Sequence, residues 1–218
     1  MIFGYVSATQ PVRAQAAAEL SLQTDYRIRG YSRSSGQPAL SLALSYDDRT
    51  GAYLGTSVTG AWVDDSPRLV AMQGYAGYAA QITPSVSVDA GVIQTHYSAR
   101  DGFRGATNYT EFYLGALARH VSAHIFVSPD YNGTGLATFY AQVEGQVDLI
   151  DSLSLDLHVG HLAYLEQAPY YRIPARQDWR LALGRHSGST NAFLALSGRL
   201  VDGDGQDTRI VAGISRSF

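Results

Sequence analysis

Residues 138–149 read Thr-Phe-Tyr-Ala-Gln-Val-Glu-Gly-Gln-Val-Asp-Leu, so every second position is apolar or glycine and the positions between are polar or tyrosine. Successive side chains of a β-strand point to opposite faces of the sheet. Strict alternation therefore predicts a strand with one apolar face and one polar face. Because Glu144 and Asp148 place carboxylates on the polar face, that face is expected to contact water or charged partners.

The same alternation recurs in both directions from this stretch, in segments separated by turn-forming residues. No comparable periodicity of 3.6 residues, which would indicate a helix, competes with it. The pattern predicts about twelve strands, which span 19–31, 39–47, 52–62, 69–82, 85–97, 108–118, 121–128, 137–149, 153–165, 177–185, 190–201 and 207–218.

The connections between these segments alternate in length. Short turns are predicted near 47–51, 83–84, 119–120, 150–152 and 185–189. Longer polar or glycine-rich connections are predicted near 32–38, 63–68, 98–107, 129–135, 166–176 and 202–206. An even number of strands with short turns at one end and long loops at the other is typical of an antiparallel transmembrane β-barrel. Both termini then lie at the short-turn end, which is the periplasmic end of such a barrel.

Composition limits the alternatives. The chain has 218 residues, no Cys and a net charge of -3, and all 16 of its basic residues are Arg. This length suits one domain, and the absence of Cys excludes disulfides and thiolate metal sites. The charge balance argues against a nucleic-acid partner. No apolar run approaches the ~18–20 residues of a membrane-spanning helix, whereas a membrane β-barrel needs only alternation.

The first residues resemble the end of a secretory signal. Residues 1–12 are fairly apolar, and Ala14-Gln15-Ala16 has the small-x-small form of a cleavage site. We therefore expect residues 1–16 to be the remnant of a signal peptide that is truncated at its start, and residues 17–218 to form the barrel. The alternative is an ordinary N-terminus of a cytosolic protein.

Three features favour a membrane barrel over a soluble β-sandwich, which would also alternate. The polar faces carry charges in mid-strand, which a barrel would place in a wet lumen. The apolar faces are aliphatic in the middle and carry aromatics such as Tyr26, Tyr46, Trp62 and Tyr78 toward their ends, as interfacial girdles do. The chain ends on Phe218 after an apolar alternation, which resembles the signal read by the outer-membrane assembly machinery.

Short tracts spread over most of the chain resemble the TorF-type porins of Gram-negative bacteria. These tracts are residues 26–32, 38–39, 51–57, 75–78, 89–92, 110–113 and the terminal Ser-Arg-Ser-Phe. The sequence departs from the family pattern after Gly55-Thr56, where an aromatic is expected, and at residues 97–99, where Tyr-Pro is expected. The resemblance implies an outer-membrane barrel with a channel role and names no solute.

We therefore expect a protein of the bacterial outer membrane that passes small hydrophilic solutes by passive diffusion. Its expected partners are outer-membrane lipid and lipopolysaccharide, and the assembly machinery that would bind the strand ending at Phe218. The alternative is a non-conducting barrel that serves as a scaffold or partner of other envelope proteins.

The inward faces predict the residues that line the pore. These are Asp25, Arg27, Arg29, Asp89, Glu111, Tyr113, Tyr140, Glu144, Asp156, His158, Arg180, Arg199 and Arg209. Because the last strand must pair with the first to close a barrel, the arginines near the two ends of the chain should form one basic wall opposite the carboxylates. Such walls would either screen solutes by charge or pair across the lumen and plug it. Twelve strands enclose more space than the ~8 that side chains just fill, which favours the pore.

Motifs for other chemistry are weak. No phosphate-binding loop, dinucleotide fingerprint or Gly-x-Ser-x-Gly elbow is present, and no cofactor is expected. A lipid hydrolase would need a Ser–His pair, for which Ser154 with His158 and Ser187 with His186 are the candidates. We regard this as a minor alternative and expect no enzyme. The carboxylates at 202, 204 and 207 have tolerable spacing for calcium, but a solvated loop explains them better because Asp and Gly are turn residues, and no metal site is predicted.

Overall fold

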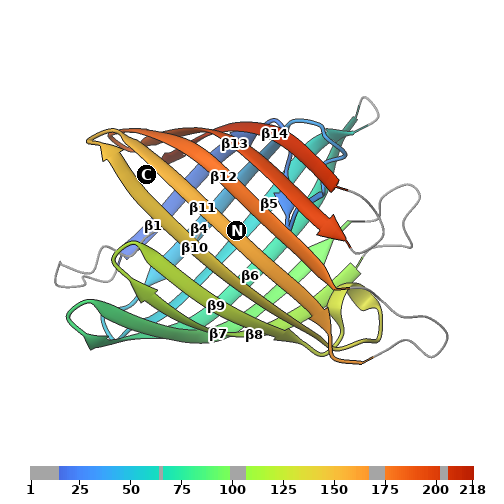
Figure 1. The fold of residues 1–218 in the computed structure, drawn as a ribbon, viewed down its shortest axis with the longest axis horizontal. Coiled ribbons are helices and arrows are strands. Elements are labelled where there is room, and N and C mark those ends of the chain that lie inside the picture. Colours follow the sequence, from blue (N-terminus) through green and yellow to red (C-terminus); the bar gives the residue numbers. More distant parts are fainter. Residues whose placement is uncertain (1–14, 64–65, 99–106, 167–174, 202–205) are drawn as a thin grey trace.

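The computed structural model of the chain describes residues 15–63, 66–98, 107–166, 175–201 and 206–218. Twelve antiparallel strands form one closed barrel in the order β1-β14-β13-β12-β11-β10-β9-β8-β7-β6-β5-β4 (Figure 1). The strands are β1 (Gln15–Gln23), β4 (Ala39–Asp47), β5 (Ala52–Val63), β6 (Ser66–Thr83), β7 (Val86–Tyr97), β8 (Thr107–Ala118), β9 (Val121–Ser128), β10 (Thr138–Ile150), β11 (Leu153–Tyr164), β12 (Arg176–Ser187), β13 (Thr190–Val201) and β14 (Gln206–Ser217). The predicted all-β barrel is confirmed.

Three small elements complete the described chain. Strands β2 (Arg27–Ile28) and β3 (Tyr31–Ser32) form a separate two-stranded sheet, and a single 3-10 turn spans Tyr131–Gly133. Within the described ranges, no helix is long and apolar enough to cross a membrane.

The barrel closes between the first and last strands, as the sequence predicts. β1 pairs with β14 through Leu22↔Ile214 on one side and with β4 through Leu22↔Leu40 on the other. Paired residues of an antiparallel ladder point to the same face. All three of these side chains are exposed, so this part of the outer wall is apolar.

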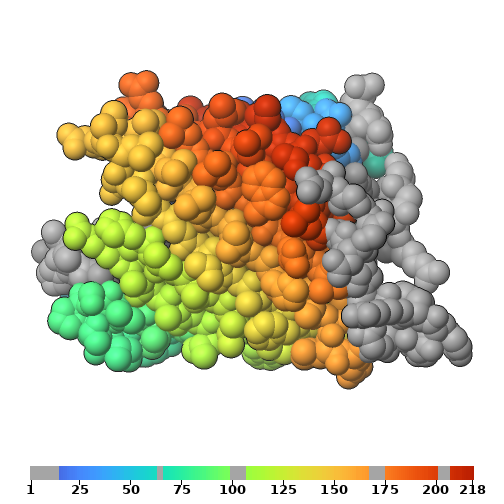
Figure 2. All heavy atoms as spheres, viewed as in Figure 1, coloured from blue at the N-terminus to red at the C-terminus, as the bar shows by residue number. Residues whose placement is uncertain are grey.

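The two faces of the wall differ sharply in chemistry. Val143 and Leu157 have 46% and 48% of their surface exposed on the outside, whereas Tyr140 and Glu111 have 1% exposed inside. Figure 2 shows that side chains of the C-terminal strands cover the outer wall between its two ends. Val143 and Leu157 therefore lie on the apolar outer face, as the alternation of their strands requires.

The predicted division of the connections is confirmed at the short end. Five turns of a few residues join β4–β5, β6–β7, β8–β9, β10–β11 and β12–β13, and β1 starts and β14 finishes at the same end. At the other end, residues 63–68 are not the long connection that was expected. Pairing of β5 with β6 continues to Val63↔Ser66, past an irregularity in register between Thr59 and Gly60.

The first strand is the main error in the predicted boundaries. The sequence predicts a strand over 19–31, but β1 spans Gln15–Gln23 and pairs Gln15 with Asp47. Beyond Thr24 the backbone makes new partners: the Tyr26 amide donates to the Ser34 hydroxyl, and the Arg33 amide donates to the Tyr26 carbonyl. Tyr26 is consequently part of the β2–β3 segment and contributes nothing to an outer girdle.

Candidate functional site in the barrel lumen

Residues 24–38 form a lumenal hairpin that carries β2 and β3. Arg27 pairs with Ser32 and Ile28 with Tyr31, so only Arg29 and Gly30 form the turn. Both turn residues have positive φ, at 49° and 73°, as a type I′ hairpin turn requires. Glycine accepts this backbone without strain, and Arg29 needs long-range contacts that stabilise it there.

The base of the lumenal hairpin is held by one buried carboxylate. Oδ1 of Asp25 accepts hydrogen bonds from the hydroxyls of Ser32 at 2.5 Å and Ser34 at 3.0 Å. Oδ2 of Asp25 accepts from Arg27 at 3.0 Å. The carboxylate therefore joins both strands of the hairpin to the chain that enters it.

Arg29 extends from the hairpin turn across the lumen to the opposite side of the barrel. Its Nη2 contacts Oε1 of Glu111 on β8 at 2.8 Å, and the two side chains are 8% and 2% exposed. Three rings surround the guanidinium: its Cζ lies 3.8 Å from the ring centre of Tyr140, 5.1 Å from Tyr131 and 5.5 Å from Phe126. Burial of an ion pair requires such additional contacts, because desolvation of the two charges is costly.

A second arginine of the hairpin also rests on tyrosine. The Arg33 Cζ lies 3.9 Å from the ring centre of Tyr97 on β7. Tyr97 is itself buried and packs against Tyr109, with ring centres 6.0 Å apart. The hairpin is thus attached to the wall formed by β7–β10 through cation–π contacts as well as through the Arg29–Glu111 pair.

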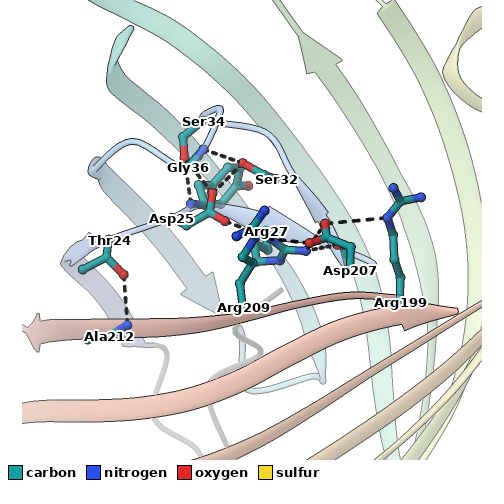
Figure 3. A network of polar contacts seen from close by, with 12 residues as sticks. Thr24, Asp25, Arg27, Ser32, Ser34, Gly36, Arg199, Asp207, Arg209 and Ala212 are labelled. Atoms are coloured by element: carbon teal, nitrogen blue, oxygen red, sulfur yellow. Dashed lines mark hydrogen bonds and ion pairs between the residues drawn. The ribbon is translucent and has the colours of Figure 1, made fainter. Parts of the chain in front are cut away.

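The hairpin contacts the C-terminal strands through a cluster of arginines around Asp207. Arg27 of β2 lies 3.0 Å from Oδ2 of Asp207, Arg209 of β14 lies 3.2 Å from Oδ1, and Arg199 of β13 lies 3.8 Å from Oδ2. Figure 3 shows the three arginines directed at this one carboxylate. We call Arg27, Arg199, Arg209 and Asp207 the arginine cluster.

A cavity of about 520 Å³ lies between the lumenal hairpin and β14. Its lining is mainly polar and consists of Thr24, Asp25, Arg27, Ser32, Ser35, Gly36, Asp207, Arg209 and Ile210. Arg209 is the most open charged group there, with 69% of its side chain exposed. The cavity therefore gives small polar molecules space beside the arginine cluster.

The remaining lumenal charges form local networks on the wall. His158 lies between two carboxylates, with its Nδ1 at 3.2 Å from Glu144 and its Nε2 at 2.8 Å from Asp178. Tyr140 donates a hydrogen bond to the same Asp178 at 3.2 Å. Tyr140 consequently connects this histidine network to the Arg29 contact.

A second wall network lies on β5, β7, β8 and β9. The hydroxyl of Tyr53 donates to Asp89 at 2.8 Å and also contacts the hydroxyl of Tyr113. Asp89 lies 3.4 Å from Nε2 of His124. These polar contacts link four strands on the inner side of the wall.

Comparison with known proteins now identifies the family. A family model described as "Bacterial protein of unknown function (Gcw_chp)" matches residues 7–216. The chain belongs to the Gcw_chp family. No curated protein matches its sequence.

Solved structures show where the Gcw_chp fold recurs. The KdgM porin matches with a TM-score of 0.59 and 14% identity, over 93% of this chain and 99% of that one. The NanC porin matches with a TM-score of 0.59 and 9% identity, over 91% and 98% of the two chains. The COG4313 outer membrane channel from Pseudomonas putida F1 matches with a TM-score of 0.55 and 14% identity, over 100% of both chains. The neighbours of this fold are therefore outer-membrane porins and channels, and the narrower resemblance to TorF-type porins stays a prediction.

The structure rearranges the residues predicted for the Gcw_chp lumen. Arg27, Arg199 and Arg209 do meet, but Arg27 and Arg29 belong to the hairpin and not to the wall of a first strand. Arg29 lies apart from the other arginines of the predicted basic wall, because it pairs with Glu111 across the lumen. The predicted separation into one basic and one acidic wall is wrong at this point, because the hairpin carries a charge from one side to the other.

The other predicted lumenal residues are divided among the wall networks. Tyr140, Glu144 and His158 are brought together, and Asp89 joins Tyr113 through Tyr53. Asp156 accepts a hydrogen bond from Ser154, and Arg180 lies over the ring of Phe193 at 4.6 Å.

Sequence reasoning missed five residues that the lumen uses: Arg33, Phe126, Tyr131, Asp178 and His124. Asp178, Phe126 and His124 fall on the inward positions of predicted strands, so the alternation could have identified them. Tyr131 and Arg33 lie in connections, where alternation gives no signal.

The Ser–His pairs weighed for a hydrolase are not the pair that forms. Ser154 contacts Nε2 of His186 at 3.2 Å, whereas His158 is engaged with carboxylates. Ser154 is only 1% exposed, which leaves no approach for a lipid ester. Among the described side chains, no group of three His, Asp or Glu could hold a metal ion. Two predicted loops lie partly outside the described residues. They are the loop weighed for calcium, at residues 202 and 204, and the long connection 166–176, at residues 167–174.

Proposed function

We propose that this Gcw_chp protein is an outer-membrane channel for passive diffusion of small hydrophilic solutes, narrowed by the lumenal hairpin. The observation that carries the proposal is a closed barrel whose outside is apolar and whose inside is polar, charged and hollow beside the hairpin. A soluble barrel is not expected to expose continuous rows of leucine and valine to water.

The outer wall suits contact with lipid. A closed barrel satisfies its backbone hydrogen bonds between strands, which hydrocarbon requires. The exposed side chains of β4 are Leu40, Leu42, Leu44 and Tyr46, and the same alternation continues around the barrel. Tyr46, Trp62 and Tyr78 are exposed toward strand ends, where lipid headgroups would contact them. This wall would face outer-membrane lipid and lipopolysaccharide.

The end of the chain suits insertion by the outer-membrane assembly machinery. β14 presents Ile210 and Ile214 outward, and Phe218 follows with 70% of its surface exposed. The start of β1 at Gln15 means that cleavage after Ala16 would remove the pairs Gln15↔Asp47 and Ala16↔Tyr46. The signal at residues 1–16 remains a prediction on sequence grounds.

The lumen supports passage of solutes better than chemistry on them. Twelve strands enclose more space than the ~8 that side chains alone fill, and a cavity of about 520 Å³ lies beside the hairpin. The porins and the channel that share this fold support the proposal, although identities of 9–14% establish only the fold.

One observation favours the alternative of a non-conducting barrel that serves as a scaffold for envelope partners. The buried Arg29–Glu111 pair connects the hairpin to the opposite wall, so the hairpin could obstruct passage altogether. The two functions differ in conductance, which can be measured directly.

Planar-bilayer recordings of purified protein test the proposal. Wild type should give discrete steps, and a variant in which residues 27–32 are replaced by two glycines should give larger steps, because the narrowing element is gone. A hairpin of the same length with Ile28→Val serves as the matched control. If the wild type gives no conductance steps and the shortened variant does, the barrel is plugged by the hairpin. Silence of both variants, with folding verified by heat-modifiable migration on gels, would refute the channel.

A further inference from the structure

We propose that the arginine cluster and the adjacent cavity form a binding site for a small organic carboxylate that carries hydroxyl groups. The proposal rests on the channel function and names the class of solute that the lumen would hold.

The arginine cluster already has the geometry of a carboxylate site. Three guanidinium groups from β2, β13 and β14 converge on the two oxygens of Asp207, at 3.0, 3.2 and 3.8 Å. Arginine is the side chain best suited to grip a carboxylate, because its planar fork donates two parallel hydrogen bonds. Asp207 thus stands where the carboxylate of a solute would be recognised.

Among the described residues, the ion pairs around Asp207 leave an excess of one positive charge. Arg27 contacts both Asp25 and Asp207, so two carboxylates balance three arginines. Arginine stays protonated at any physiological pH, which makes this excess permanent. An added anion would remove it.

Two of the three arginines have donors to spare. Arg209 contacts Asp207 through Nε, and its Nη1 and Nη2 have no partner among the described residues. Arg199 approaches through Nε at the long distance of 3.8 Å, while its guanidinium lies 4.2 Å from the ring centre of Tyr31. Arg209 lines the cavity. Figure 3 shows its side chain beside Arg27 and Asp207.

The cavity provides the remaining recognition. Its volume of about 520 Å³ is within the ~300–1,000 Å³ of small-molecule sites. Thr24 and Ser35 bring hydroxyl groups to it, while the Ser32 hydroxyl is already donated to Asp25. The hydroxyls of a solute can form hydrogen bonds with such groups and a purely apolar acid cannot, so hydroxylated carboxylates should be preferred.

Arg29 and Arg180 offer no comparable site. Arg29 is enclosed by Tyr140, Tyr131 and Phe126 and is already paired with Glu111. Arg180 lies over Phe193 away from the cavity. Arg180 therefore serves as a control for the general effect of a positive charge in the lumen.

Isothermal titration calorimetry of the detergent-purified barrel with sodium gluconate tests the site without depending on conductance. Wild type should bind gluconate saturably and should not bind glucose, which has the hydroxyls without the carboxylate. Arg209→Gln should weaken binding about tenfold or more, the usual effect of losing a hydrogen bond to a charged group. Arg180→Gln should change the affinity less than twofold. Asp207→Asn should strengthen binding, because it removes the internal competitor.

Asp207→Asn should strengthen gluconate binding and Arg209→Gln should weaken it. These opposite changes in affinity distinguish a binding site from a general electrostatic effect of the lumen. Equal weakening by Arg209→Gln and Arg180→Gln would overturn the site in favour of the net charge of the lumen. Absence of saturable gluconate binding would also overturn it, whether or not the protein conducts. If the Asp207→Asn variant does not fold, as judged by loss of heat-modifiable migration, Arg209→Lys is the deciding variant. Lysine keeps the positive charge but lacks the planar guanidinium fork. Wild-type affinity for gluconate in that variant would refute recognition by the guanidinium fork. If the protein binds gluconate but gives no conductance in bilayers, the channel function is refuted and the binding site is supported.

Discussion

The barrel wall and the lumenal hairpin meet at Thr24, yet they depend on different interactions. In β1, each residue pairs with strands beside it, and Leu20 and Leu22 point outward by simple alternation. In the hairpin, Arg29 pairs with a residue 82 positions away and Arg27 with one 180 positions away. The wall is therefore fixed by many similar small contacts, whereas the hairpin is fixed by a few charged contacts that cannot be replaced by neighbours.

The strongest test of this difference is the buried ion pair. Glu111→Gln leaves the Arg29 charge buried without its carboxylate, and loss of one partner of a buried pair typically costs about 3–5 kcal/mol. Urea unfolding should show this loss, and conductance should rise as the hairpin detaches. Thr110→Val on the exposed side of the same strand is the control. An unchanged midpoint of unfolding would mean that the pair contributes nothing to docking of the hairpin.

The wall should respond to the face of a substitution more than to its type. Val143 is 46% exposed on the outside, and its neighbour Gln142 is 6% exposed inside. An Arg on the lipid face at the bilayer midplane costs ~2–4 kcal/mol, so Val143→Arg should reduce folding into lipid vesicles, measured by heat-modifiable migration. Gln142→Arg should be tolerated better. Equal damage from the two would contradict the assignment of the outer face to lipid.

The hairpin turn should be sensitive to one methyl group. Gly30 has φ of +73°, and a Cβ there would lie 2.7 Å from the Cβ of Arg199, whereas Gly36 has φ of +75° with nothing within 4 Å. Left-handed backbone costs a non-glycine residue ~1–2 kcal/mol at either position. Gly30→Ala should therefore destabilise the protein more than Gly36→Ala, in urea unfolding of both variants. Similar losses would show that the turn can move away from β13.

The sequence allowed the wall to be predicted because its signal is local and repeated. Alternation identifies strands such as β10 and β11 within a residue or so of their ends. The same signal extended the first strand too far, since Asp25, Arg27 and Arg29 continue the alternation into the hairpin. Gly30 is the one residue there that suits a two-residue turn, because such turns usually carry Asn, Asp or Gly where Arg29 stands.

The position of the hairpin could not be predicted in the same way. Nothing near Arg29 in sequence indicates that its partner is Glu111, or that Tyr140, Tyr131 and Phe126 surround it. Such contacts depend on which strands face each other across the closed barrel, and alternation does not record that. The grouping of Arg27 with Arg199 and Arg209 was predictable because strand closure brings the ends of the chain together.

The smallest expected effect concerns ion selectivity, and it separates the two kinds of arginine in the cluster. Arg27 is 5% exposed and contacts Asp25, Asp207 and the carbonyl of Gly30, so Arg27→Gln should mainly loosen the hairpin. Arg199 and Arg209 are 24% and 69% exposed, so replacing both by Gln should move the reversal potential across a salt gradient toward cations.

Acid should move the selectivity in the opposite direction. Carboxylates lose their charge as pH falls toward ~4, whereas arginines keep theirs. The wild-type pore should therefore become more anion-selective on acidification, and the double variant at Arg199 and Arg209 should show a smaller change because fewer fixed cations remain exposed. Arg180→Gln gives the effect of one lumenal charge outside the cluster. If neither acidification nor replacement of the two exposed arginines changes the reversal potential, the cluster serves only to hold the hairpin against β13 and β14. The buried and the exposed arginines would then have the same structural role.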